Sequence, residues 1–69
     1  MNLLEYLKQK MEANKTSRNK EIQRLSLDSD VSTVTIYKLT KKQIINPALF
    51  TMNKIRIATE NKVSFEDFL

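Results

Sequence analysis

The sequence predicts an all-α fold, a compact bundle of about five short helices. Apolar residues recur at spacings of three and four in several segments, as they do in amphipathic helices. Only one segment is rich in β-branched and aromatic residues, so a strand formed there would have no partner. The chain has 69 residues, and we assign one small domain to residues 1–69.

Apolar stripes and capping residues predict the first two helices. The first stripe consists of Leu3, Leu4, Leu7 and Met11. We expect Asn14 to end this helix in the left-handed conformation, because the chain contains no glycine. Thr16 or Ser17 can then cap a second helix. The apolar edge of that helix is formed by Ile22 and Leu25.

A break is expected at residues 27–30, which read Leu-Asp-Ser-Asp. Asp and Ser side chains form hydrogen bonds with the nearby backbone and so favour turns. Without glycine, a left-handed position must be filled by a residue that carries a side chain. Asp28 or Asp30 is the residue we expect there.

Residues 31–39 allow two interpretations. Six of these nine residues are β-branched or aromatic, which favours a strand. A lone strand would leave its backbone groups unpaired, whereas a β-branched residue costs a helix well under about 1 kcal/mol relative to alanine. We therefore predict a helix at about 32–41 that begins at the N-cap Ser32.

This predicted helix has two different faces. Ile36 and Leu39 share the apolar face. The opposite face combines a hydroxyl, an apolar contact and a cation, a set that suits base edges in the major groove. Its residues are Thr33, Val34, Tyr37 and Lys38.

Two further helices are predicted in the C-terminal third of the chain. Asn46 and Pro47 form a favourable helix start, because Asn caps the free amides and Pro suits the first helical position. The apolar stripe that follows consists of Leu49, Met52, Ile55 and Ala58. Ser64 begins the last helix, with Asp67 three residues later completing a capping box. Its apolar residues are Phe65, Phe68 and Leu69.

Composition indicates a binding protein rather than an enzyme. The chain has no histidine and no cysteine, which are the commonest general base and the best nucleophile. We therefore expect no catalytic residue. The acids show no spacing of the kind found in metal-binding loops, so we also expect no metal and no cofactor. No apolar segment reaches the roughly 18–20 residues of a membrane span, and no signal peptide is visible. We expect a cytoplasmic protein without a small-molecule ligand.

The charge distribution is uneven. The formal net charge is +4, and nine of the twelve cations lie between residues 8 and 42. Four of the eight acids lie near the ends of the chain, at positions 5, 60, 66 and 67. This pattern favours a phosphate-binding face, and a merely solvated basic surface is the alternative.

The spacing of Ser26, Asp30, Ile36 and Leu39 resembles the helix-turn-helix of the phage repressor and Cro family, the lambda-repressor-like DNA-binding domains. That family has a small residue in its first helix and a turn residue four positions later. Apolar residues follow six and nine positions after the turn. Residues 57–68, IATENKVSFEDF, are similar to the closing pattern of the family, and the resemblance covers residues 3–69. Here Asp30 replaces the usual turn glycine, and Ser29 occupies a position that is usually apolar.

The resemblance implies a sequence-specific DNA-binding regulator, a repressor of phage, prophage or plasmid type, that binds double-stranded DNA as a homodimer. The base-reading residues it implies are Ser32, Thr33, Val34, Tyr37 and Lys38. The phosphate-binding residues it implies are Arg18, Lys20, Arg24, Lys41 and Lys42. The dimer interface it implies consists of Phe65, Phe68 and Leu69.

Other interpretations stay open for several of these residues. Phe65 and Phe68 are equally consistent with core packing, and Tyr37 can cover the edge of the core with its hydroxyl in water. Thr33 and Thr35 are also consistent with surface positions that have no partner. The alternative function is a protein-binding module on the same scaffold, such as an antitoxin or the partner of a regulator. An RNA-binding protein is a weaker third option, because no base-stacking motif is present.

Overall fold

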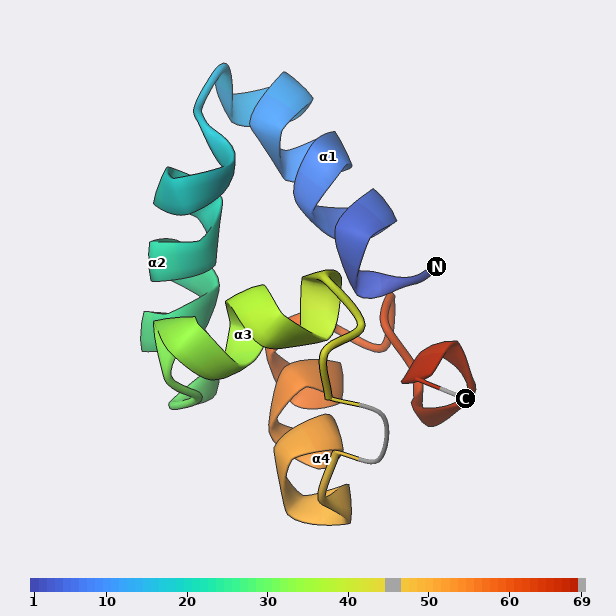
Figure 1. Ribbon diagram of the computed structural model, residues 1–69. Helices are drawn as coiled ribbons and strands as arrows, with labels where there is room; N and C mark the ends of the chain where they lie inside the picture. The colour runs from blue at the N-terminus through green and yellow to red at the C-terminus, as the bar shows by residue number, and fades with distance from the viewer. Residues whose placement is uncertain (45–46, 69) are drawn as a thin grey trace.

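The computed structural model describes residues 1–44 and 47–68, and these residues form a compact all-α fold. They contain the helices α1 (Leu3–Asn14), α2 (Arg18–Ser29), α3 (Thr33–Thr40) and α4 (Leu49–Ala58). A single 3-10 turn, η1 (Phe65–Phe68), takes the place of the fifth helix that the sequence predicted (Figure 1). The all-α prediction is confirmed for the described residues, whereas five full helices are not observed.

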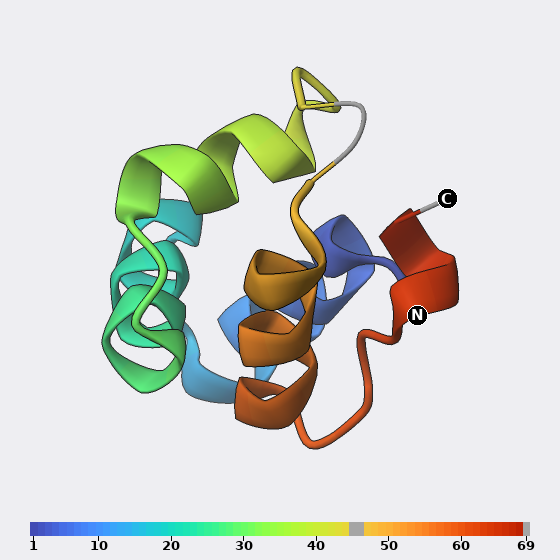
Figure 2. The same ribbon diagram turned by 90° about the horizontal axis from the view of Figure 1, so that it is seen from below.

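Helix α2 is the central element of the packing. It contacts α1, α3 and α4, while η1 packs against α4. Figure 2 shows α3 along the outer side of the bundle, with α4 beneath it and α1 on the far side. The core between them is built from Leu3, Tyr6, Leu7, Ile22, Leu25, Val31, Ile36, Leu39, Ile55 and Val63.

Side-chain caps fix the beginnings of three helices, as the sequence indicates for two of them. Ser17 and Ser32 accept hydrogen bonds from the third backbone N–H of α2 and α3. Asn2 and Glu5 form a reciprocal capping box at the start of α1. Each cap satisfies N–H groups that the first helical turn leaves free.

Five described residues adopt a left-handed backbone although each carries a side chain: Lys15, Asp30, Lys42, Glu60 and Asn61. Asp30, with φ 58°, confirms one of the two expected positions between α2 and α3. The prediction for Asn14 is wrong, because α1 includes this residue and Lys15 takes the left-handed position one residue later. The side-chain amide of Asn14 instead donates a hydrogen bond of 3.3 Å to the Glu21 carboxylate of α2.

The break between α2 and α3 is shorter than predicted. Residues 27–29 are helical, and only residues 30–32 connect the two helices. Ser29 sustains the last turn of α2, because its buried hydroxyl donates a hydrogen bond of 2.6 Å to the carbonyl of Leu25. This intrahelical partner makes a serine acceptable at a position facing the core.

The helix predicted for residues 32–41 is confirmed as α3, Thr33–Thr40. Ile36 is fully buried and Leu39 is buried, so these two residues form its inner face. Val31, just before the helix, also lies in the core. A strand here is excluded by the observed backbone, in agreement with the lack of a partner strand among the described residues.

Helix α4 begins later than predicted. It starts at Leu49 with Ala48 as its N-cap and without a side-chain capping bond. Asn46, which we expected to cap this helix, lies outside the described residues. Ile55 is fully buried, but Leu49 is 65% exposed, so the predicted apolar stripe is wrong at Leu49.

The segment after α4 is fixed by two side-chain oxygens. The buried hydroxyl of Thr59 donates to the carbonyl of Ile55 and accepts from the backbone N–H of Val63. The Asp67 carboxylate accepts from the backbone N–H and the hydroxyl of Ser64. This is half of the predicted capping box, because the Asp67 N–H donates to the Ser64 carbonyl instead of to the Ser64 hydroxyl. The hydrogen bond from the Ser64 backbone is the main reason that the pKa of Asp67 lies below its ordinary value.

Candidate nucleic-acid interface

The outer face of α3 is a mixed polar and apolar surface that the sequence predicted and that the structure leaves exposed. Thr33, Val34, Tyr37 and Lys38 are all exposed, and Val34 is 59% exposed. They lie opposite the buried pair Ile36 and Leu39, because residues one turn apart on a helix share a face. The structure therefore brings these four predicted residues together on one exposed surface.

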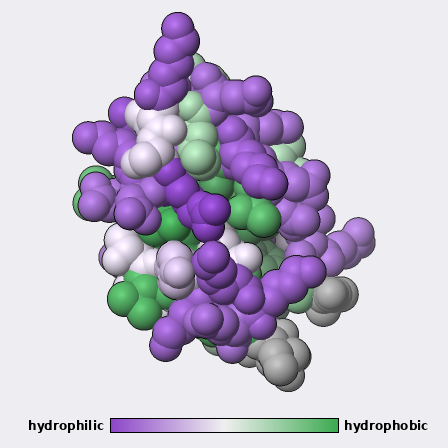
Figure 3. Space-filling view, turned by 45° about the horizontal axis from the view of Figure 1, so that its top comes forward, coloured by the Kyte–Doolittle hydropathy of each residue, from purple (hydrophilic) through white to green (hydrophobic). Residues whose placement is uncertain are grey.

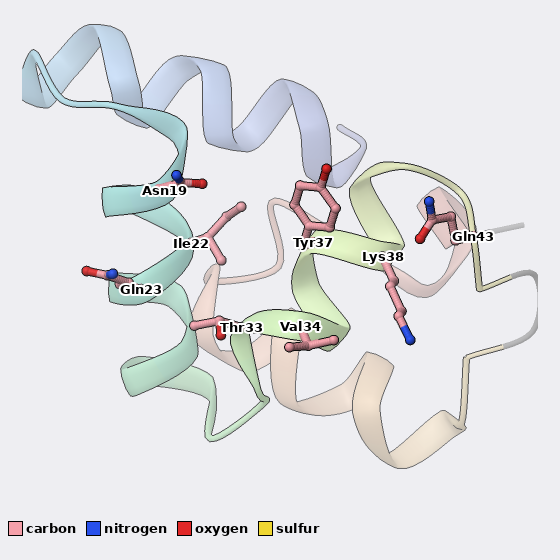
Figure 4. Close-up of a pocket in the computed structure, with 8 residues that line it drawn as sticks. All are labelled: Asn19, Ile22, Gln23, Thr33, Val34, Tyr37, Lys38 and Gln43. Carbon is pink, nitrogen blue, oxygen red and sulfur yellow. The ribbon is translucent and has the colours of Figure 1, made fainter.

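A surface groove of about 370 Å³ runs between α2 and this face of α3. Its α3 side is formed by the same four residues, Thr33, Val34, Tyr37 and Lys38. Figure 4 shows Ile22 at the base of the groove between the two helices, with Lys38 extending away from α2. The groove is thus apolar at its base and polar at its edges.

Three residues of this groove were missed by the sequence analysis. Asn19 and Gln23 come from α2, and Gln43 follows the end of α3 (Figure 4). All three carry amides, which both donate and accept hydrogen bonds and suit base edges or phosphate oxygens. No sequence signal distinguished them, because their position beside α3 depends on how the two helices pack.

Ser32 differs from the other predicted base-reading residues. Its hydroxyl accepts from the backbone N–H of Thr35 and donates to the Thr35 hydroxyl at 2.8 Å. Both hydrogen-bonding functions of this hydroxyl therefore act within the chain, at the start of α3. The geometry supports a capping role for Ser32 more strongly than a contact with a ligand.

The C-terminal end of α3 gathers three exposed cations, Lys38, Lys41 and Lys42. The ammonium group of Lys41 lies 5.6 Å from the ring centre of Tyr37, and its charge is thereby held beside the outer face. Lys42 has φ 57°, and the next N–H, that of Gln43, donates to the carbonyl of Lys38 at 2.9 Å. This tight turn places Lys42 directly after the helix.

The three predicted phosphate contacts of α2 are spread around that helix. Arg18 is half-buried at the first position of α2, and Lys20 is exposed. Arg24 lines a different groove, between α1 and α2, where its guanidinium lies 3.6 Å from the buried Glu21 carboxylate. The structure does not bring Arg24 to the groove of α3.

The predicted interface residues have unequal exposure. Phe68 is partly buried against the core, which agrees with the core-packing interpretation. Phe65 is 37% exposed, and the guanidinium carbon of Arg56 lies 5.4 Å from its ring centre. Leu69 lies outside the described residues. Much more exposed apolar side chains occur on α4, at Leu49, Phe50 and Ile57, and the sequence analysis did not assign these to any surface.

Figure 3 shows a face covered mainly by hydrophilic residues, with separate hydrophobic areas between them. No group of three or more acidic side chains that could hold a metal ion occurs in residues 1–44 and 47–68. Within the same residues, no helix has the length and apolar character needed to cross a membrane.

Comparison with known proteins gives no further assignment, because no family model, curated protein or solved structure matches this chain.

Proposed function

We propose that this chain is a sequence-specific DNA-binding regulator that places α3 in the major groove. In this proposal α2, the connection at residues 30–32 and α3 form a helix-turn-helix. The observation that supports it most is the outer face of α3, which combines exposed Thr33, Val34, Tyr37 and Lys38 without any acid. A helix of this kind fits the major groove, where hydroxyls, methyls and cations can contact base edges.

The charge on and beside α3 supports the same proposal. Lys41 and Lys42 follow the helix directly, and both are exposed. In a docked complex they lie beside the phosphate backbone, while Lys38 faces a guanine and Val34 faces a thymine methyl. Arg18 and Lys20 supply further phosphate contacts from α2.

We further propose that two copies bind two half-sites about one helical turn apart and repress transcription. Phe65 is the aromatic side chain of the C-terminal segment that remains accessible for this dimer contact, since Phe68 packs against the core.

The direct test is a binding-site selection from random duplex DNA, repeated at increasing salt. We expect one enriched motif and an affinity that falls with salt, by about 0.9 logarithmic units per phosphate contact and per tenfold increase in salt. Lys38→Ala is expected to relax the preference at one base pair, whereas Lys42→Ala weakens all sequences alike.

The control is Lys8→Ala, which removes an exposed cation from α1 and leaves the α3 surface intact. It is expected to change neither the motif nor the affinity by more than about twofold. Selection without enrichment, or affinity that does not respond to salt, contradicts the proposal. Stronger binding to single-stranded RNA of the same sequence would assign the surface to RNA instead.

A further inference from the structure

The outer face of α3 carries one wholly apolar side chain that is open to water. This residue, Val34, is 59% exposed. Its exposed neighbours on the same face each end in a polar or charged group and are Thr33, Tyr37 and Lys38. Figure 4 shows Val34 between Thr33 and Lys38 on the side of α3 that borders the groove. Covering an exposed apolar side chain with another apolar group is favourable, because both leave water. A ligand of this face therefore gains affinity where it places an apolar group against Val34.

The charge around Val34 is positive. Lys38, Lys41 and Lys42 are exposed. Among the residues that the structure describes, no acid lies within ion-pair distance of these three ammonium groups. Helix α3 itself contains no Asp or Glu. This uncompensated charge favours a polyanion as the ligand, which is consistent with the duplex DNA of the proposed function.

The side chains of α3 limit how this helix can recognise an A·T base pair. In the major groove, adenine is commonly read by the amide of Asn or Gln, and guanine by Arg or Lys. Helix α3 contains no Asn, Gln or Arg, and Lys38 is its only cation. The amides of the groove belong to Asn19, Gln23 and Gln43, which lie outside α3. The apolar group that unmodified DNA presents in the major groove is the 5-methyl group of thymine. Contact with this methyl group is therefore the way in which Val34 can distinguish A·T from G·C.

We propose that Val34 recognises the 5-methyl group of a pyrimidine, so that affinity depends on the presence of this methyl group and not only on the identity of the base. The inference rests on the proposed function and names the chemical group that its binding surface contacts. Uracil is thymine without the methyl group, so it is a poor substitute at this position. Cytosine that carries a 5-methyl group presents the same apolar contact, so it is bound better there than cytosine itself. Methylation of the DNA thereby strengthens binding at this base pair.

The test compares four forms of one duplex. The duplex enriched by the binding-site selection is synthesised with thymine, uracil, cytosine or 5-methylcytosine at each pyrimidine position of both strands in turn, always opposite the matching purine. Affinity is measured by fluorescence anisotropy. At one position we expect thymine to bind about fourfold more tightly than uracil, the effect of burying one methyl group. At the same position we expect 5-methylcytosine to exceed cytosine by a similar factor.

Val34→Ser assigns this methyl effect to one side chain. The variant removes the apolar contact, so both ratios are expected to fall below about twofold. The matched control is Ile57→Ser, because Ile57 is 62% exposed and belongs to α4, which contributes no residue to the groove. It is expected to keep both ratios. Lys42→Ala is expected to weaken all four duplexes alike, since a phosphate contact does not sense the base. Circular dichroism confirms that each variant keeps its helix content.

The outcomes separate this inference from the proposed function. A selection that enriches no motif contradicts the proposed function and removes this inference with it. An enriched duplex that is bound equally well with thymine and with uracil at every position overturns this inference alone. A methyl effect that persists in Val34→Ser also overturns it, because the methyl group then acts through another side chain or through the shape of the DNA. Loss of the effect in Ile57→Ser as well would likewise contradict the assignment to Val34.

Discussion

The hydroxyl of Ser29 donates a hydrogen bond of 2.6 Å to the backbone carbonyl of Leu25, and both side chains are buried. This contact explains how α2 keeps a serine on its core face. A buried hydroxyl without a partner is costly, whereas one bonded to its own helix is tolerated. The next residue, Asp30, is the left-handed C-cap of α2, and its N–H donates to the carbonyl of Ser26.

Removing this hydroxyl is predicted to change stability little, whereas replacing it with a charged group is predicted to lower stability strongly. Ser29→Ala removes both the donor and its desolvation cost, so the free energy of unfolding should change by less than about 1 kcal/mol. Ser29→Asp buries an unpaired charge and should cost more than about 3 kcal/mol. Urea denaturation followed by circular dichroism measures both, and similar losses for the two variants would contradict this account.

Thr59 is predicted to hold the C-terminal segment through its side-chain oxygen. Thr59→Val keeps the shape but leaves the N–H of Val63 without its acceptor at a buried position, which should cost about 1–3 kcal/mol of unfolding free energy. Hydrogen exchange of the Val63 amide should accelerate in this variant. Thr59→Ser retains the hydroxyl and serves as the control, with slow exchange at Val63.

The stability of the protein is predicted to depend on which residue occupies the left-handed position of Asp30. Asp30→Gly should preserve stability within about 1 kcal/mol, because glycine adopts positive φ without steric cost. Asp30→Val should lose about 1–2 kcal/mol or more, since a β-branched side chain is poorly accommodated there. Thermal unfolding distinguishes the two. The lost ion pair with Lys54 contributes little because Asp30 is almost fully exposed.

Asp67 is predicted to make stability depend on acid pH. Its pKa in the folded protein is lowered, chiefly by the hydrogen bond from the Ser64 backbone, below the ordinary value of 3.8. The stabilisation is therefore complete above that value and is lost as the pH falls through the lower folded pKa. In Asp67→Asn this part of the pH dependence should disappear, as measured by urea unfolding across acid pH. An unchanged acid profile would contradict it.

The two cations Arg24 and Lys42 are predicted to differ in their effect on DNA affinity. Arg24 lies beside Glu21 in the groove between α1 and α2, whereas Lys42 follows the end of α3. Arg24→Ala should leave affinity for the selected duplex within about twofold of wild type, and Lys42→Ala should reduce the salt slope by about one. Fluorescence anisotropy over a salt series provides both values. Equal losses would place Arg24 back in the phosphate-binding set.

Much of the fold could be predicted from local chemistry. The cap Ser32 follows from short-range hydrogen bonding. The same local chemistry narrowed the second cap to Thr16 or Ser17 and the left-handed residue to Asp28 or Asp30, of which the structure shows Ser17 and Asp30. Helix boundaries were less predictable. Asparagine favours the left-handed conformation more than lysine does, so local preference pointed to Asn14 rather than to Lys15. The contact of the Asn14 side-chain amide with the Glu21 carboxylate of α2 is tertiary and could not be predicted. The late start of α4 at Leu49 could not be predicted either, because its N-cap Ala48 provides no side-chain signal.

The candidate site was predictable only in part. Helical periodicity predicts that Thr33, Val34, Tyr37 and Lys38 are exposed on α3. It does so once Ile36 and Leu39 are assigned to the core. Asn19 and Gln23 line the same groove as these α3 residues because α2 packs against α3, and no local sequence pattern predicts that packing. The exposure of Leu49, Phe50 and Ile57 was likewise unpredictable, since apolar residues on a helix are ordinarily assigned to the core.

The sequence by itself determined that residues 33–40 are helical, because the backbone of a lone strand would have no hydrogen-bond partner. It also determined which side chains of that helix face outward. Only the tertiary structure decided which side of α4 meets the core, which cation joins Glu21, and which α2 residues border α3. The physical reason is that periodicity defines the faces of a helix, whereas the angles at which helices pack decide what each face contacts.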